Sequence, residues 1–252
     1  MKKLLFILVL GLTFMASKCE DDSNPQGQID MNFKASFGTE PLVMFADDYP
    51  YEDGMDVKFQ LFQFYISEIT LLKDLNDGTG TEILDVELVS FKDIQDAAAA
   101  EQGIDITIAD IPPGEYQGIR IGLGVDPDLN KTNTGDYTPG HPLSDHYWSA
   151  ALGYVFTKIE GNADLEGNGD FQEKLTFHIG TDPYFRSKTF TKPMTIEAGG
   201  IADLNFTIDL RDILVDSDGE YLDFRTTPQD HTNDADVAAF ISDNLKEALK
   251  LE

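Results

Sequence analysis

The segment 140–161 contains the residues whose types and spacing point most directly to chemistry. It holds two of the four histidines, His141 and His146, and the only tryptophan, Trp148. His146 and Trp148 are two positions apart, so an extended backbone would turn both side chains to one face. A neutral imidazole can bind copper, zinc, nickel or iron, and an aromatic neighbour can shield a partly buried ion from water. The segment therefore indicates a candidate metal site, the alternative being a loop histidine beside a core tryptophan.

Another candidate ligand, His178, lies in a segment with the alternation of a β-strand. In 175–179 three apolar residues share one parity, so His178 points to the opposite face. We expect this strand to pair antiparallel with 153–160 across a turn, which places His178 at the end nearest Trp148. The spacing therefore predicts that two histidines, distant in sequence, meet at one edge of a sheet.

The other two histidines are additional candidates. His141 could be a further ligand or a neighbour of the ligands. His231 precedes a predicted C-terminal helix, close to its expected cap at Asn233 or Asp234. It is either a third imidazole of the site or a surface histidine of the capping region.

Several motifs match one known family. They are His141-Pro142-Leu143, His146-Tyr147-Trp148-Ser149, Gly153-Tyr154, Lys158, Glu160-Gly161, Phe177-His178-Ile179-Gly180 and, upstream, Phe64-Tyr65-Ile66-Ser67-Glu68-Ile69, Ile111-Pro112-Pro113-Gly114-Glu115-Tyr116 and Ile119-Arg120-Ile121-Gly122. In these residues the chain resembles the MbnP-like family of bacterial envelope proteins, whose namesake is the periplasmic copper-binding partner of methanobactin systems.

The resemblance implies a single β-rich domain that binds copper through histidines, here His146 and His178. In some members a separate dihaem enzyme oxidises a tryptophan to kynurenine, and Trp148 is the matching residue. An unmodified indole has only a donor N–H, whereas the aryl amine of kynurenine can approach a copper ion. The family often has a second aromatic residue where this chain has Ala150-Ala151. The resemblance and the affinity order of divalent ions favour copper over zinc.

The net charge and the absence of common catalytic motifs argue against several classes of function. The 252 residues include 18 Lys and Arg against 46 Asp and Glu, a formal net charge of −28. Such a surface repels nucleic acid and anionic membranes, so neither is an expected partner. The chain has no GxSxG, no HExxH and no phosphate-binding glycine loop. We therefore expect storage, delivery or sensing of a metal ion rather than catalysis.

The N-terminus has the pattern of an export signal. Within residues 1–18, Lys2 and Lys3 are followed by a short apolar run, and Lys18 stands directly before Cys19, the only cysteine. This arrangement predicts a lipoprotein whose lipidated Cys19 begins a flexible tether, 19–28. The expected location is the outer membrane, on its periplasmic side or at the cell surface, with the lipid as the only membrane contact. Lipidation would leave no thiol for a metal or catalytic site.

The remaining chain, 29–252, predicts one antiparallel all-β sandwich with one C-terminal amphipathic helix. Apolar alternation marks the strands, and a change of parity near Leu61 predicts a β-bulge. The polar stretch 126–140 predicts a long loop that leads into the site segment. Apolar residues at helical spacing within 237–249 predict the helix.

Two other functions are compatible with this sequence. One is a surface β-sandwich that binds a glycan or a protein through aromatic residues in loops, namely Tyr49, Tyr51, Tyr137 and Tyr184. The other is a structural lipoprotein in which the histidines and Trp148 only pack.

Overall fold

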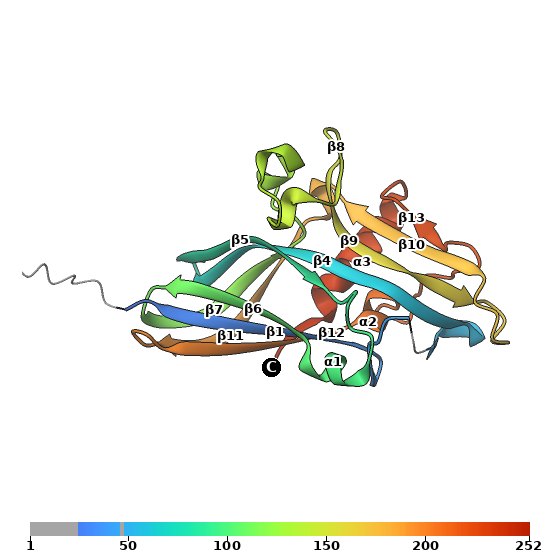
Figure 1. Ribbon diagram of the computed structural model, residues 1–252, viewed down its shortest axis with the longest axis horizontal. Helices are drawn as coiled ribbons and strands as arrows, with labels where there is room; N and C mark the ends of the chain where they lie inside the picture. Colours follow the sequence, from blue (N-terminus) through green and yellow to red (C-terminus); the bar gives the residue numbers. More distant parts are fainter. Residues whose placement is uncertain (1–24, 46–47) are drawn as a thin grey trace, which may run out of the picture.

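The computed structural model describes residues 25–45 and 48–252, which form two β-sheets stacked face to face (Figure 1). In the described residues the smaller sheet consists of β1 (Gly27–Phe37), β2 (Glu40–Pro41), β6 (Ile104–Ile111), β12 (Ile201–Asp209) and β14 (Leu249–Leu251). The larger sheet consists of β3 (Tyr49–Pro50), β4 (Asp56–Leu72), β5 (Gly80–Ser90), β7 (Gly114–Leu123), β8 (Tyr147–Ser149), β9 (Gly153–Asp164), β10 (Glu173–Gly180), β11 (Arg186–Ile196) and β13 (Gln229–Asp230).

The core lies between the two sheets because alternate residues of each strand face inward. In β1, Ile29, Met31 and Phe33 are fully buried, while the residues between them are half-buried. Phe33 stacks on Phe206 of the neighbouring strand with ring centroids 4.8 Å apart. Each such side chain contributes about 1.5–3 kcal/mol of burial free energy. The predicted all-β sandwich with a C-terminal helix is confirmed.

Both sheets are mixed, however, because each contains one parallel pair. β1 pairs with β12 in parallel, and β10 pairs with β13 in parallel. These partners are far apart in the sequence, and alternation within one strand carries no information about the direction of a distant neighbour.

The long strand β4 contains the predicted bulge. Its register against β9 shifts between Phe59 and Leu61. Phe59 and Phe62 therefore both face the core, although three positions separate them. After the bulge Gln63 lies on the outer face of the sheet.

A second, smaller apolar cluster covers part of that outer face. It comprises Tyr65, Val86, Val125, Leu143, Tyr154 and Phe156. The stretch predicted as a loop closes over it and contains the short 3-10 turns η2 (Leu129–Lys131) and η3 (Thr134–Asp136), followed by η4 (Pro142–Ser144). Figure 1 shows these turns and β8 projecting above β9. The site segment is thus held on the sheet by its own apolar cluster.

Three helices of the described residues pack against strands of the two sheets. They are α1 (Ala97–Gln102), α2 (Leu210–Leu214) and α3 (Ala235–Ala248), with further 3-10 turns η1 (Glu52–Gly54) and η5 (Asp182–Tyr184). The Asp234 side chain accepts from the backbone N–H groups of Asp236 and Val237, which confirms it as the cap of α3. Ile241 and Leu245 of α3 are buried in the core.

The first described strand begins earlier than expected. β1 starts at Gly27, inside the tether predicted over 19–28, and the Gln28 backbone N–H donates to Gly200 O at 2.9 Å. The predicted signal at 1–18 and Cys19 lie outside the described residues. Across 25–45 and 48–252 no helix combines the length and the apolar character needed to cross a membrane.

Candidate metal site on the outer face of the larger sheet

Four neighbouring strands bring a row of polar side chains together on the outer face of the larger sheet. Gln63 of β4 is in register with Ser90 of β5 on one side and with Lys158 of β9 on the other. Lys158 is in turn in register with His178 of β10. We call these four residues the outer-face row. Adjacent strands lie about 5 Å apart, so side chains in such a row can contact their neighbours.

His146 lies against this row from the loop before β8. Its Nδ1 is 2.8 Å from Lys158 Nζ, and its Nε2 is 3.2 Å from the Gln63 side-chain nitrogen. The His146 carbonyl accepts from Val155 N at 2.8 Å, which fixes the loop to β9. The site therefore includes Lys158 and Gln63, which the sequence analysis did not select as site residues.

The prediction that an extended backbone turns His146 and Trp148 to one face is wrong. His146 has a φ of 60°, in the left-handed region, so the backbone is not extended from His146 to Trp148. Trp148 instead belongs to β8, and its ring lies beside Gly180 of β10: a Cβ added there would be 3.1 Å from Trp148 Cζ3. The indole is half-buried, at the end of β10 that also carries His178.

His178 is held by a carboxylate and by another imidazole. Its Nε2–H donates to Glu160 Oε1 at 2.7 Å, and its side chain is 18% exposed. The His231 ring lies edge-on to it, with centroids 4.9 Å apart and an interplanar angle of 85°. Pairing of β9 with β10 confirms the predicted hairpin that carries His178.

The loop after β13 positions His231. The buried Asp230 carboxylate accepts from the backbone N–H groups of Thr232, Asn233 and Asp234. The Thr232 hydroxyl donates to His178 O at 2.9 Å and accepts from Gly180 N at 3.0 Å. The exposed His231 imidazole is thus braced against the end of β10.

His141 has a different environment. Its ring stacks on Tyr137 with centroids 4.2 Å apart, and its Nδ1 accepts from Leu143 N at 3.1 Å, which caps η4. In the described part of the chain no hydrogen bond or ring contact joins His141 to His146 or His178.

Burial favours the neutral form of the groups in the site. It lowers the pKa of His146, an effect that the nearby Lys158 ammonium reinforces. Burial also lowers the pKa of His178, against the opposing effect of Glu160. Lys158, whose ammonium contacts His146, is in register with His178 on the next strand, so both imidazoles are neighbours of Lys158. At neutral pH both rings are therefore neutral and can offer a lone pair to a metal.

A family model described as MbnP matches residues 26–234, which is more than half of the chain. The chain belongs to the MbnP family. Among solved structures, MbnP from Methylosinus trichosporium superposes with a TM-score of 0.54 at 14% identity, over 89% of this chain and 97% of that one. This similarity confirms a shared fold. Among curated proteins no match is found. The MbnP family is associated with copper-related function.

The donor atoms of this MbnP-family chain fit a copper ion only in part. Two neutral imidazoles suit copper. In the stretches 25–45 and 48–252, however, no group of three or more His, Cys, Asp or Glu side chains is arranged to hold a metal. Both ring nitrogens of His146 have partners, whereas no hydrogen bond from a described residue reaches His178 Nδ1. A metal at His146 would have to displace one of these partners.

The aromatic residues assigned to a glycan-binding surface do not form one in this MbnP-family fold. Tyr49 is 2% exposed and Tyr51 is 7% exposed, and both belong to the core between the sheets. Tyr137 stacks on His141. Tyr49 and Tyr51, expected in a loop, therefore have no exposed ring face, and Tyr184 is half-buried against the same core.

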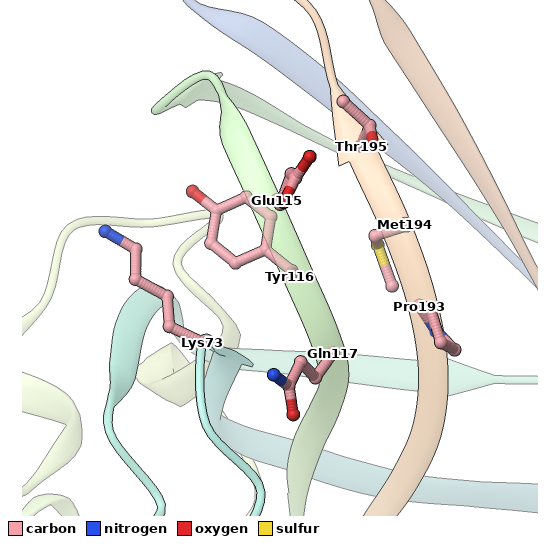
Figure 2. Close-up of a pocket in the computed structure, with 7 residues that line it drawn as sticks. All are labelled: Lys73, Glu115, Tyr116, Gln117, Pro193, Met194 and Thr195. Atoms are coloured by element: carbon pink, nitrogen blue, oxygen red, sulfur yellow. The ribbon is translucent and has the colours of Figure 1, made fainter.

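A hollow of about 410 Å³ lies over β7 and β11 (Figure 2), and none of its lining residues belongs to the outer-face row. Its one aromatic side chain, Tyr116, is 2% exposed and donates its hydroxyl to Pro112 O at 2.7 Å. The ring therefore cannot offer a free face for stacking on a sugar.

Glu160 and Lys158 could have been found from the sequence. Tyr154, Phe156, Lys158 and Glu160 share one parity of β9, so two apolar residues followed by two charged residues mark the border between a covered and an open part of the same face. Gln63 follows the predicted bulge and has the parity opposite to Phe62 and Phe64, so its face could also be read from the sequence, but its contact with His146 could not.

Proposed function

We propose that this MbnP-family protein binds copper through His146 and His178, for storage, delivery or sensing rather than catalysis. The observation that carries the proposal is that a loop and a strand distant in sequence bring two neutral, half-buried imidazoles to the same outer-face row. Family membership supports copper over zinc, and the affinity order of divalent ions agrees.

The hydrogen bonds assign a ligand atom to each imidazole. Glu160 accepts from His178 Nε2–H, which leaves the lone pair on Nδ1. If Lys158 donates to His146 Nδ1, the ring proton is on Nε2, and the Gln63 amide can turn its oxygen toward it. Metal-binding histidines usually have the second ring nitrogen held in this way. We therefore assign Nδ1 as the copper ligand of both residues.

Two residues are available to complete the coordination. Trp148 lies at the same end of β10, and as kynurenine, formed by a dihaem partner enzyme, it would add an aryl amine. His231 lies against His178 and would add a third imidazole. His141, with Nδ1 engaged in capping η4, is a ligand only if that cap opens.

The proposed cellular setting follows from the N-terminal pattern. A lipid on Cys19 would hold the domain at the outer membrane, on the periplasmic side or at the cell surface. The strongly acidic domain would remain off the anionic lipid surface because like charges repel.

A copper titration tests the proposal. Cu(I) and Cu(II) are each titrated into the purified domain against a chromophoric competing chelator, with wild type, His146→Ala, His178→Ala and His231→Ala compared. We expect the first two substitutions to weaken binding by roughly 100-fold or more, because each removes a ligand. If His231→Ala weakens copper binding as strongly as the first two substitutions, His231 is a ligand. If its affinity equals that of wild type, His231 is only a neighbour of the site.

The matched control is His141→Ala. It also removes one imidazole, but the His141 ring stacks on Tyr137 instead of lying against the outer-face row. It should bind copper as wild type does. If His146 and His178 can both be removed without a change in copper affinity, the proposal fails. The mass of the peptide containing Trp148, from cells that also make the dihaem enzyme, tests the oxidation separately.

A further inference from the structure

Lys158 has an unusual partner for a lysine in so acidic a protein. Its half-buried side chain forms no ion pair with a carboxylate in the described residues, although the chain has 46 Asp and Glu. Its ammonium donates instead to the Nδ1 lone pair of the neutral His146 imidazole, at 2.8 Å. The position of Lys158 in the outer-face row, between Gln63 and His178, holds the ammonium at this point.

We infer that the Lys158 ammonium occupies, in the metal-free protein, the position at His146 Nδ1 that copper takes, so that copper binding exchanges one cation for another and Lys158 sets the affinity of the site. This inference rests on the proposed copper function. It adds a residue that controls the affinity of that site without being a ligand.

The exchange follows from the number of lone pairs available. A neutral imidazole has one unprotonated nitrogen, and here the other nitrogen faces Gln63. An ammonium N–H and a copper ion therefore compete for the same Nδ1 lone pair. If the ammonium and the copper ion were both beside His146 Nδ1, their positive charges would also repel each other, more strongly in a half-buried site than in water.

Two nearby carboxylates can accept the displaced ammonium. Glu160 follows Lys158 on the same face of β9, and the Asp145 carboxylate lies beside His146. Both carboxylates act electrostatically on Lys158. The flexible four-carbon stem of lysine lets Nζ move from the imidazole toward these oxygens without a change in the backbone.

Lys158→Leu tests the inference, because leucine keeps an apolar stem and offers no donor or ligand atom. We expect its copper dissociation constant to be roughly tenfold lower than that of wild type, or lower still. Lys158→Arg keeps the charge and should bind no more tightly than wild type. Lys174→Leu is the matched control, since it removes one positive charge from an exposed position on β10. Circular dichroism and thermal unfolding establish that each variant is folded.

A measurement without metal keeps this test independent of the copper function. In the metal-free protein the ¹⁵N resonance of His146 Nδ1 should move in Lys158→Leu, while the resonances of His141 stay unchanged. An unmoved His146 resonance overturns the inference, as does a Lys158→Leu protein that binds copper equally well or more weakly. If wild type itself binds no copper, the proposed function fails. If wild-type binding needs His146 but Lys158→Leu gains nothing, only the inference fails.

Discussion

His178 and His231 lie ring edge against ring face, with centroids 4.9 Å apart, although one belongs to β10 and the other to the loop after β13. The loop is held by a single buried carboxylate, Asp230, and by the Thr232 hydroxyl, which bridges His178 O and Gly180 N. Thr232 has a φ of 57°, which is strained for a β-branched residue. The strain persists because these hydrogen bonds hold the loop, so the position of His231 depends on them.

Asp230→Ala should therefore destabilise the fold and release His231. The substitution leaves three backbone N–H groups without their acceptor, which we expect to lower the free energy of unfolding by about 2 kcal/mol or more. Urea unfolding measures the change. Asp216→Ala is the control, because Asp216 accepts from backbone N–H groups in an exposed turn and its loss should cost less. Equal losses in the two variants would contradict the assigned role of Asp230.

Glu160→Leu should weaken copper binding by about 10–100-fold, because it removes the carboxylate that orients His178 through Nε2–H. Glu160→Gln keeps an acceptor oxygen and should lose less. Chelator competition measures both constants. Glu166→Leu, in the exposed turn after β9, controls for the change in net charge. Equal losses in the leucine and glutamine variants would show that Glu160 acts by its charge alone, because both substitutions remove that charge.

Gly180→Val should disturb both the hairpin and the indole. A Cβ at this position would be 2.4 Å from Tyr154 O and 3.1 Å from Trp148 Cζ3. We expect a loss of about 1–3 kcal/mol in the free energy of unfolding, from overpacking. The fluorescence of Trp148, the only tryptophan, should change as well. Gly114→Ala meets nothing nearer than 3.8 Å and should leave both signals unchanged.

The stability of the metal-free protein should fall as the pH is lowered from 7.5 to 5.5. Burial lowers the pKa of His146 and of His178 in the folded protein, below the value of about 6.5 in the unfolded chain. In this window the unfolded state binds more protons. The contribution of the two histidines is thus fully present above pH 6.5 and is lost as the pH falls toward the folded values.

The measurement is urea unfolding at several pH values, with the His146→Asn, His178→Asn double variant as the comparison. The double variant should show a smaller change over the same window. A wild-type curve that is flat, or that rises toward pH 5.5, would contradict the assigned direction of the shifts.

Strand alternation was enough to predict much of the site's framework. The parity of β10 correctly placed His178 opposite the apolar row, and the change of parity in β4 correctly placed the bulge. Both features repeat with the period of the backbone and are readable within one segment. The cap of α3 at Asp234 could likewise be predicted from residues within one short segment. The same reasoning failed at His146, where a left-handed backbone breaks the period.

The sequence by itself determined which faces of the strands are apolar, and through the family motifs it indicated which imidazoles to consider. Only the tertiary structure decided what surrounds them: Lys158 and Gln63 against His146, Glu160 and His231 against His178. The physical reason is that a side chain's orientation follows from its own backbone, whereas its partners follow from sheet register and loop closure between segments far apart in the chain.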